Sequence, residues 1–142
     1  MIRNYGNLCV LRGMLIGSGA VANTVVNAVK SLPSQPVIIA TSSTGILSTA
    51  NKLPFLLKPF YKLLLAEPHV DKINMENAIA DNTQKWVLVR GALYTNGKKK
   101  GVYRTGEMEV GYTISRRDIA DFIVRECLNG EKWIGKRPVV VY

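Results

Sequence analysis

The segment QPVIIATSSTG, residues 35–45, predicts how the whole chain is organised. Its apolar, β-branched run at residues 37–40 ends abruptly in four small hydroxyl residues and a glycine. A short apolar run between turn signals is typical of a buried strand in a parallel sheet. Ligands of open α/β sheets bind just beyond the carboxyl ends of the strands, so these hydroxyls are candidate site residues. On this stretch alone, hydroxyls that only cap the next segment or bond within a turn are the stronger interpretation. The four residues are Thr41, Ser42, Ser43 and Thr44.

The length and charge of the chain limit the classes of protein that it can be. With 142 residues, 47% of them hydrophobic, the default is one domain, residues 1–142, with its own core. That is too short for a complete doubly wound dinucleotide domain plus a substrate domain. The formal charge is +9, from 19 Lys and Arg against 10 Asp and Glu. It favours anionic partners such as a phosphorylated cofactor, nucleic acid or an acidic membrane surface, although a solvated basic surface explains it equally well.

The cysteines and the single histidine do not predict a metal site. Cys9 and Cys127 lie far apart and form no CxxC pair, and one His cannot complete a usual zinc set with them. We expect two reduced, buried thiols in a cytoplasmic protein. Arg12 interrupts the apolar run near the N-terminus, which argues against a secretory signal there.

Residues 53–66 are apolar, but two prolines and two lysines interrupt them. They fall short of the ~20 apolar residues that a membrane span needs. The pattern predicts a helix from Pro54 that covers the sheet or a pocket mouth; a helix lying on a membrane surface is the alternative.

A glycine turn near the start of the chain suggests a phosphate-binding loop. Residues 7–16 predict a strand, and a helical pattern follows the turn as far as Lys30. Gly17 and Gly19 fit a permissive dinucleotide fingerprint, in which backbone N–H groups at a helix start bind phosphate. The acidic residue expected about twenty positions later is missing, so a plain strand-to-helix turn is the stronger interpretation. With the strand at residues 37–40, these elements form a βαβ unit.

A second helix is predicted from Pro68 to about Asp81. His69, the only histidine, and Lys72 share a face of it, one turn apart. A lysine near a cofactor can hold ribose hydroxyls and lower a neighbouring pKa. At the start of a helix, however, a lone His or Lys is more often a solvated surface residue.

The last third of the chain predicts strands and one clear helix. Residues 86–93 form a buried strand with a break at Gly91, and residues 96–101 a basic loop. Short strands are expected at residues 101–104, 110–113 and 138–142. Ser115 with Asp118 is a capping-box variant that opens a helix ending near Gly130. The inward residues of that helix are Ile119, Phe122, Ile123 and Cys127.

Taken in order, several of these motifs resemble one family. They are residues 37–45, the segment PHVDK at 68–72 with Glu76, WVLVRGAL at 86–93, Asn96-Gly97 and ISRRDIA at 114–120. Together they resemble the C-terminal portion of an atypical short-chain dehydrogenase/reductase. The most similar branch is the NmrA-like, NAD(P)H-binding group that includes flavin/biliverdin-reductase-like proteins. The resemblance implies a partial Rossmann-like fold, a doubly wound and mostly parallel sheet lacking the first βαβ units, with NADP or NAD as cofactor and NADPH favoured.

The resemblance also implies roles for particular residues. Thr41, Ser42 and Ser43, with Thr44 next to them, match the strand end that faces the nicotinamide. Lys72 matches the helix lysine beside the ribose, and Ser42 or His69 would assist proton transfer. Gly17 and Gly19 would lie in the loop after the fourth strand of the complete fold. The strand end and turn beside the nicotinamide would be Arg90, Gly91, Ala92 and Leu93.

Two departures from the family pattern stand out. The usual catalytic Tyr, four residues before the lysine, is Pro68 here. The six residues before Asn7 leave no room for the opening strand and its glycine-rich loop, so the pyrophosphate would lose its main anchor. Where the Tyr is absent, holding the hydride donor and acceptor together supplies most of the rate.

Three functions remain open at this point. The first is an NAD(P)H-dependent reductase of a small planar or carbonyl acceptor. The second is a non-catalytic, truncated relative or redox-sensing regulator. The third is a binder of nucleic acid or anionic surfaces through residues 98–100, which we do not favour because no aromatic platform accompanies the lysines. A shortened sheet also predicts a homodimer formed through an exposed sheet edge.

Overall fold

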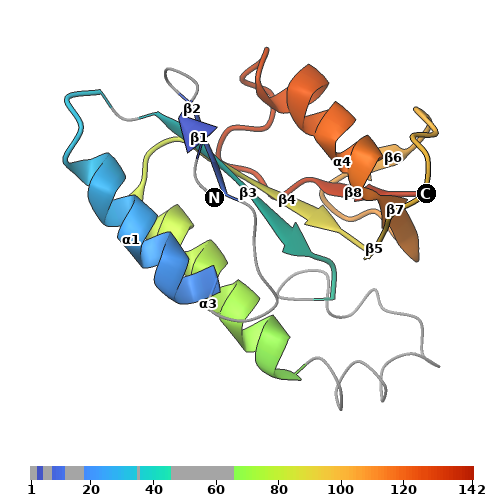
Figure 1. Cartoon of the computed structure of the whole chain (residues 1–142), viewed down its shortest axis with the longest axis horizontal. Coiled ribbons are helices and arrows are strands. Elements are labelled where there is room, and N and C mark those ends of the chain that lie inside the picture. The colour runs from blue at the N-terminus through green and yellow to red at the C-terminus, as the bar shows by residue number, and fades with distance from the viewer. Residues whose placement is uncertain (1–2, 5–7, 12–17, 35, 46–65) are drawn as a thin grey trace.

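The main sheet places the 37–43 segment near its centre. The computed structural model describes residues 3–4, 8–11, 18–34, 36–45 and 66–142. Within these ranges six strands form one sheet in the order β1-β2-β3-β4-β8-β6 (Figure 1). The inner strands β2, β3, β4 and β8 are parallel, while β1 and β6 are antiparallel to their neighbours at the two edges. Their bounds are β1 Arg3–Asn4, β2 Leu8–Leu11, β3 Val37–Ser43, β4 Trp86–Gly91, β6 Arg104–Gly106 and β8 Val139–Val141.

Helices cover both faces of this sheet. On one face lie α1 (Ser18–Lys30) and α3 (Ala66–Asn82), side by side (Figure 1). On the other face lies α4 (Arg116–Phe122), which continues as a π-helical segment, η3 (Ile123–Cys127). A parallel sheet between two helical layers is the Rossmann-like arrangement, so the predicted α/β class is confirmed.

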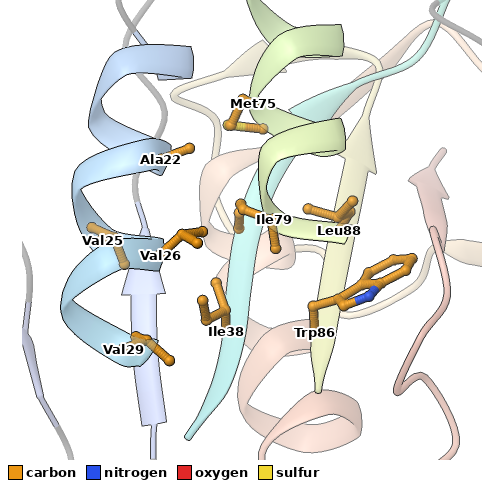
Figure 2. Close-up of a cluster of buried hydrophobic side chains, with 10 residues drawn as sticks. Ala22, Val25, Val26, Val29, Ile38, Met75, Ile79, Trp86 and Leu88 are labelled. Atoms are coloured by element: carbon orange, nitrogen blue, oxygen red, sulfur yellow. The ribbon is translucent and has the colours of Figure 1, made fainter. Parts of the chain in front are cut away.

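Helix α1 is amphipathic, as its sequence predicts. Figure 2 shows the inward side chains of α1 and α3 meeting above β3 and β4. The spacing of three and four residues along α1 puts one apolar stripe against the sheet. The cluster contains Ala22, Val25, Val26, Val29, Ile38, Ala40, Met75, Ile79, Trp86 and Leu88.

A second apolar cluster fills the opposite face, beneath α4. Side chains alternate along each strand, so Ile38 and Ala40 face α1 and α3 whereas Ile39 faces α4. By the same alternation Ser42 and Arg90 point to the α1/α3 side. The second cluster contains Ile39, Val87, Val89, Ile114, Ile119, Phe122, Cys127, Trp133 and Val140.

The structure corrects the expected course of the chain after β4. The break expected at Gly91 is confirmed, because β4 ends there; beyond it the chain leaves the main sheet and enters a small second sheet. That sheet pairs β5 (Leu93–Thr95) in parallel with β7 (Thr113–Ser115). The short strands expected at 101–104 and 110–113 are β6 and β7, each displaced toward the C-terminus. The Asp118 carboxylate in α4 accepts the Lys100 and Gly101 N–H groups, so these groups are not available for pairing with a strand.

Other predicted elements are confirmed, and some lie outside the described residues. The helix expected from Pro68 begins two residues earlier, and Pro68 sits in its first turn, where a backbone N–H is not needed. Ser115 caps α4: its hydroxyl accepts the Asp118 N–H at 3.0 Å. Of the strand at 7–16, residues 8–11 are β2; residues 12–17 and the helix from Pro54 are not described. No helix within the described ranges is long and apolar enough to cross a membrane.

Candidate functional site

The hydroxyl cluster at the end of β3 lies beside the end of β4. The register pairs Ser42 with Arg90 and Ser43 with Gly91. The Thr44 N–H donates to the Gly91 carbonyl at 2.9 Å, which continues the pairing one residue beyond the strand. Two segments that are 48 residues apart in sequence, as counted from Ser42 to Arg90, therefore form one edge of the site. This edge is where parallel sheets bind ligands.

Ser42 carries the feature that most directly indicates a ligand. It is 2% exposed, and its Oγ has no hydrogen-bond partner in the described part of the chain. A buried, unsatisfied polar group costs about 1–3 kcal/mol, so proteins seldom keep one without a use for it. The capping and turn alternatives require a bond from this hydroxyl to nearby backbone, and no described backbone group makes one. Thr41, Ser43 and Thr44 are half-buried around it.

Arg90 is committed to holding α3 on the sheet. It is fully buried, and its Nε and Nη2 donate to the two carboxylate oxygens of Glu76 at 3.0 and 2.6 Å. Arg137 adds a third bond to Glu76 at 3.2 Å. A bidentate Arg–carboxylate pair fixes both partners in one geometry. The resemblance implies a place for Arg90 at the cofactor and does not indicate this ion pair. An arginine inside an apolar strand is the signal that could have predicted it, because a buried charge needs a partner.

His69 and Lys72 lie near the start of α3, on the side of the sheet at which β3 and β4 end (Figure 1). Both side chains are half-buried. Burial lowers the pKa of His69 below its ordinary value. Burial also lowers the pKa of Lys72, against the opposing effect of the Asp71 and Glu76 carboxylates. A half-buried lysine between acids differs from the fully solvated surface residue that was the alternative.

The start of α1 is packed tightly against α3. The Gly19 N–H donates to Asp71 Oδ1 at 3.0 Å. A Cβ at Gly19 would lie 3.3 Å from Asn74 Cβ and 3.3 Å from Asp71 Oδ1, so the glycine allows this close approach. A carboxylate of the chain itself thus accepts one N–H that a phosphate-binding loop would offer. This contact favours the plain turn over a phosphate cradle at Gly19, and Gly17 lies outside the described residues.

The turn after β4 brings a further residue to the site, which the sequence did not indicate. Ala92 is buried and Leu93 is 63% exposed. Tyr94, which follows, folds back so that its hydroxyl donates to the Ser42 carbonyl at 2.6 Å and accepts the Gly91 N–H at 3.1 Å. No local sequence pattern predicts such a return.

The basic loop is anchored to the rest of the molecule. Lys99 forms an ion pair with Asp121 at 2.5 Å, and the Lys100 ammonium lies 3.7 Å from the centre of the Tyr142 ring. The buried Asp118 accepts the Lys100 and Gly101 N–H groups. Although burial alone would raise it, these bonds and those from Ser115 and Tyr142 hold the pKa of Asp118 below its usual range. Two of the three lysines therefore have partners within the chain. No cluster of three or more potential metal ligands occurs within the described ranges.

Comparison with known proteins agrees with this geometry. The family model described as NAD(P)H-binding matches residues 10–129. Among curated proteins, the reductase pytE of Aspergillus terreus is 32% identical over 127 residues, covering 75% of this chain and 48% of that protein. The oxidase pynE of Aspergillus niger is 29% identical over 127 residues, covering 75% and 45%. The chain thus spans about half the length of these curated relatives.

Solved structures share the fold. A short-chain dehydrogenase/reductase of Veillonella parvula in complex with NADP superimposes with a TM-score of 0.80 at 14% identity, covering 97% of this chain and 64% of that one. ChuY, an anaerobilin reductase of Escherichia coli O157:H7, gives 0.72 at 15% identity, covering 94% and 63%. The expected resemblance to short-chain dehydrogenases/reductases is confirmed. With its family match over most of its length and its Rossmann-like sheet, this chain belongs to the NAD(P)H-binding family.

Proposed function

We propose that this chain binds NADPH or NADH at the carboxyl ends of β3 and β4 and serves the reduction of a small planar or carbonyl acceptor. The observation that carries the proposal is the Ser42 hydroxyl, which is buried at this edge without a hydrogen-bond partner among the described residues. A bound cofactor or acceptor would satisfy it. When bound, the reduced nicotinamide supplies the hydride.

The residues around Ser42 fit such a ligand. Ser42 would donate or accept one hydrogen bond and so orient the reacting groups. Lys72, half-buried one turn before Glu76, would hold ribose hydroxyls from α3. The backbone of Gly91 and Ala92 would form the adjacent wall. The +9 charge of the chain supports an anionic cofactor, and supports NADPH over NADH because of its additional phosphate.

Proton transfer is the weaker part of the chemistry. Pro68 stands where related dehydrogenases have their Tyr, so no phenol is available at that position. Burial lowers the pKa of His69 below its ordinary value, which disfavours the protonated imidazole that would donate a proton. Proximity and orientation would therefore supply most of the rate, and well-oriented reactants gain as much as ~7–11 kcal/mol in this way.

Turnover tests this proposal directly. NADPH oxidation is followed by absorbance with flavin, quinone and carbonyl acceptors, for the wild-type chain, Ser42→Ala and the control Ser115→Ala. We expect turnover with at least one acceptor, and a loss of about tenfold or more in kcat/KM for Ser42→Ala alone. Turnover that is equal in wild type and Ser42→Ala would contradict the role of Ser42.

The alternative within the same family is an NAD(P)H-binding protein that does not catalyse reduction. Pro68 in place of the catalytic Tyr favours it. Saturable NADPH binding with no acceptor turnover would identify this second function. In that case the bound cofactor would serve as a redox signal.

A further inference from the structure

We propose that Tyr94 is a positioning residue of the site, whose hydroxyl joins the ends of β3 and β4 and so fixes Ser42 and Gly91 relative to each other. The inference rests on the proposed function, because it assigns Tyr94 a part in cofactor binding. It acts through the backbone of residues at the site and does not require contact with the ligand.

The hydrogen bonds of Tyr94 link the two strand ends. Its hydroxyl donates to the Ser42 carbonyl at 2.6 Å and accepts the Gly91 N–H at 3.1 Å. Because Ser43 is paired with Gly91, a parallel ladder directs this same N–H toward this same carbonyl. The phenol thus bridges a carbonyl and an N–H that face each other near the ends of the two strands. Ser42 is held by its carbonyl while its Oγ stays available.

The ring of Tyr94 packs on Gly91, and only glycine allows this. A Cβ at residue 91 would lie 2.5 Å from Tyr94 Cζ and 2.7 Å from its hydroxyl oxygen. Real Cβ atoms do not approach other atoms so closely. The packing of Tyr94 therefore requires a glycine at residue 91, whether or not a ligand also contacts the backbone there.

Tyr94 is itself held from the far side. It lies in β5, paired with Ile114 of β7. The Arg116 guanidinium donates to the Tyr94 carbonyl at 3.3 Å and to Asn96 Oδ1 at 2.8 Å. The second sheet and the start of α4 thereby fix the backbone of Tyr94 beside the ends of β3 and β4.

These contacts suit Tyr94 to a positioning role, not to the proton donation of the catalytic Tyr that Pro68 replaces. The Tyr94 hydroxyl donates its hydrogen bond to a backbone carbonyl, and burial raises the pKa of the phenol above its ordinary value. A buried phenol with its proton in use is a poor proton donor to an acceptor. Its contribution is geometric, and small displacements of reacting groups have large effects on binding and rate.

The test compares two tyrosines that each lose one hydroxyl. Tyr94→Phe removes the phenol bridge between the ends of β3 and β4 and leaves their ladder in place. Tyr103→Phe is the matched control, since its hydroxyl also bonds within the protein, to Asp121 at 3.1 Å, but away from the strand ends. The Kd for NADPH is measured by fluorescence titration, well below the melting temperature of each variant. We expect Tyr94→Phe to weaken NADPH binding about tenfold, equal to about 1.4 kcal/mol, and Tyr103→Phe to leave it unchanged.

A second variant disturbs the contact between Tyr94 and Gly91 by changing the glycine. Gly91→Ala retains the phenol but pushes it away, and it should weaken NADPH binding as Tyr94→Phe does. Gly97→Ala, where the nearest atom to a new Cβ is 3.6 Å away, is its control. If the wild-type chain binds NADPH and both site variants bind it equally well, the Tyr94 inference is overturned while the proposed function stands. If the wild-type chain does not bind NADPH, the proposed function fails and takes this inference with it.

Discussion

Arg90 at the end of β4 and Glu76 in the middle of α3 form a fully buried, bidentate ion pair. Arg90 is the register partner of Ser42, so the pair ties α3 to the strand ends that form the site. Glu76 lies one turn after Lys72 on the same helix. The position of Lys72 and of the start of α3 relative to the sheet therefore depends on this pair.

Breaking this pair should destabilise the fold severely. Glu76→Gln removes the charge that compensates Arg90, and loss of one partner of a buried pair costs about 3–5 kcal/mol. Urea denaturation gives the free energy of unfolding. The control is Glu126→Gln, whose ion pair with Lys132 is solvent-exposed at 3.6 Å and should contribute less than about 1 kcal/mol. Similar losses for the two variants would contradict a special role for the buried pair.

Ser42→Ala should separate stability from function. Its Oγ makes no hydrogen bond with the described residues, so we expect a free energy of unfolding within about 1 kcal/mol of wild type, on the stabilising side. Ser115→Ala also removes a serine Oγ, but this one caps α4, so the free energy of unfolding should fall by about 1–2 kcal/mol. Thermal and urea unfolding of both variants provide the comparison. A large loss of stability in Ser42→Ala would show that its hydroxyl has a structural partner.

His69 should make stability depend on pH below neutrality. Burial lowers its pKa in the folded state, whereas the unfolded chain keeps the ordinary value of about 6.5. The unfolded state then binds more protons between these two values, so stability is full above pH ~6.5 and falls as the pH drops through the folded pKa. As His69 is the only histidine, its imidazole NMR signals report this pKa without assignment. His69→Gln should remove this part of the pH dependence; a folded pKa above 6.5 would reverse the predicted sign.

Gly91→Ala should be costly because of Tyr94. The new Cβ would overlap the ring, and overpacking of this kind costs about 1–3 kcal/mol. In a Tyr94→Ala background the overlap disappears, so the same substitution should be nearly neutral. A double-mutant cycle measured by urea denaturation gives the coupling between the two residues. Additive effects would mean that Gly91 is needed for another reason.

Much of the fold could be predicted because its signals are local. The apolar runs at residues 37–40 and 86–90 predicted β3 and β4, and the hydroxyl cluster after β3 predicted the edge of the site. Ser115 and Asp118 predicted the start of α4, since a capping box is completed within four residues.

The remaining features depend on contacts between distant segments. Tyr94 donates to the Ser42 carbonyl and the Gly19 N–H donates to Asp71, and each of these bonds joins residues 52 positions apart. Hydrophobic periodicity carries no information on such pairs. The ion pair between Arg90 and Glu76 could have been predicted, because a charge in a buried strand must be compensated.

A titration of the chain with NADPH, followed by intrinsic fluorescence and calorimetry, tests the central claim most directly. Its control is the Ser42→Ala variant, which should keep the fold and which loses the buried hydroxyl that has no partner among the described residues. The account predicts saturable binding in the micromolar range that weakens about tenfold in Ser42→Ala. No binding by the wild-type chain at millimolar NADPH would contradict a cofactor site at the ends of β3 and β4.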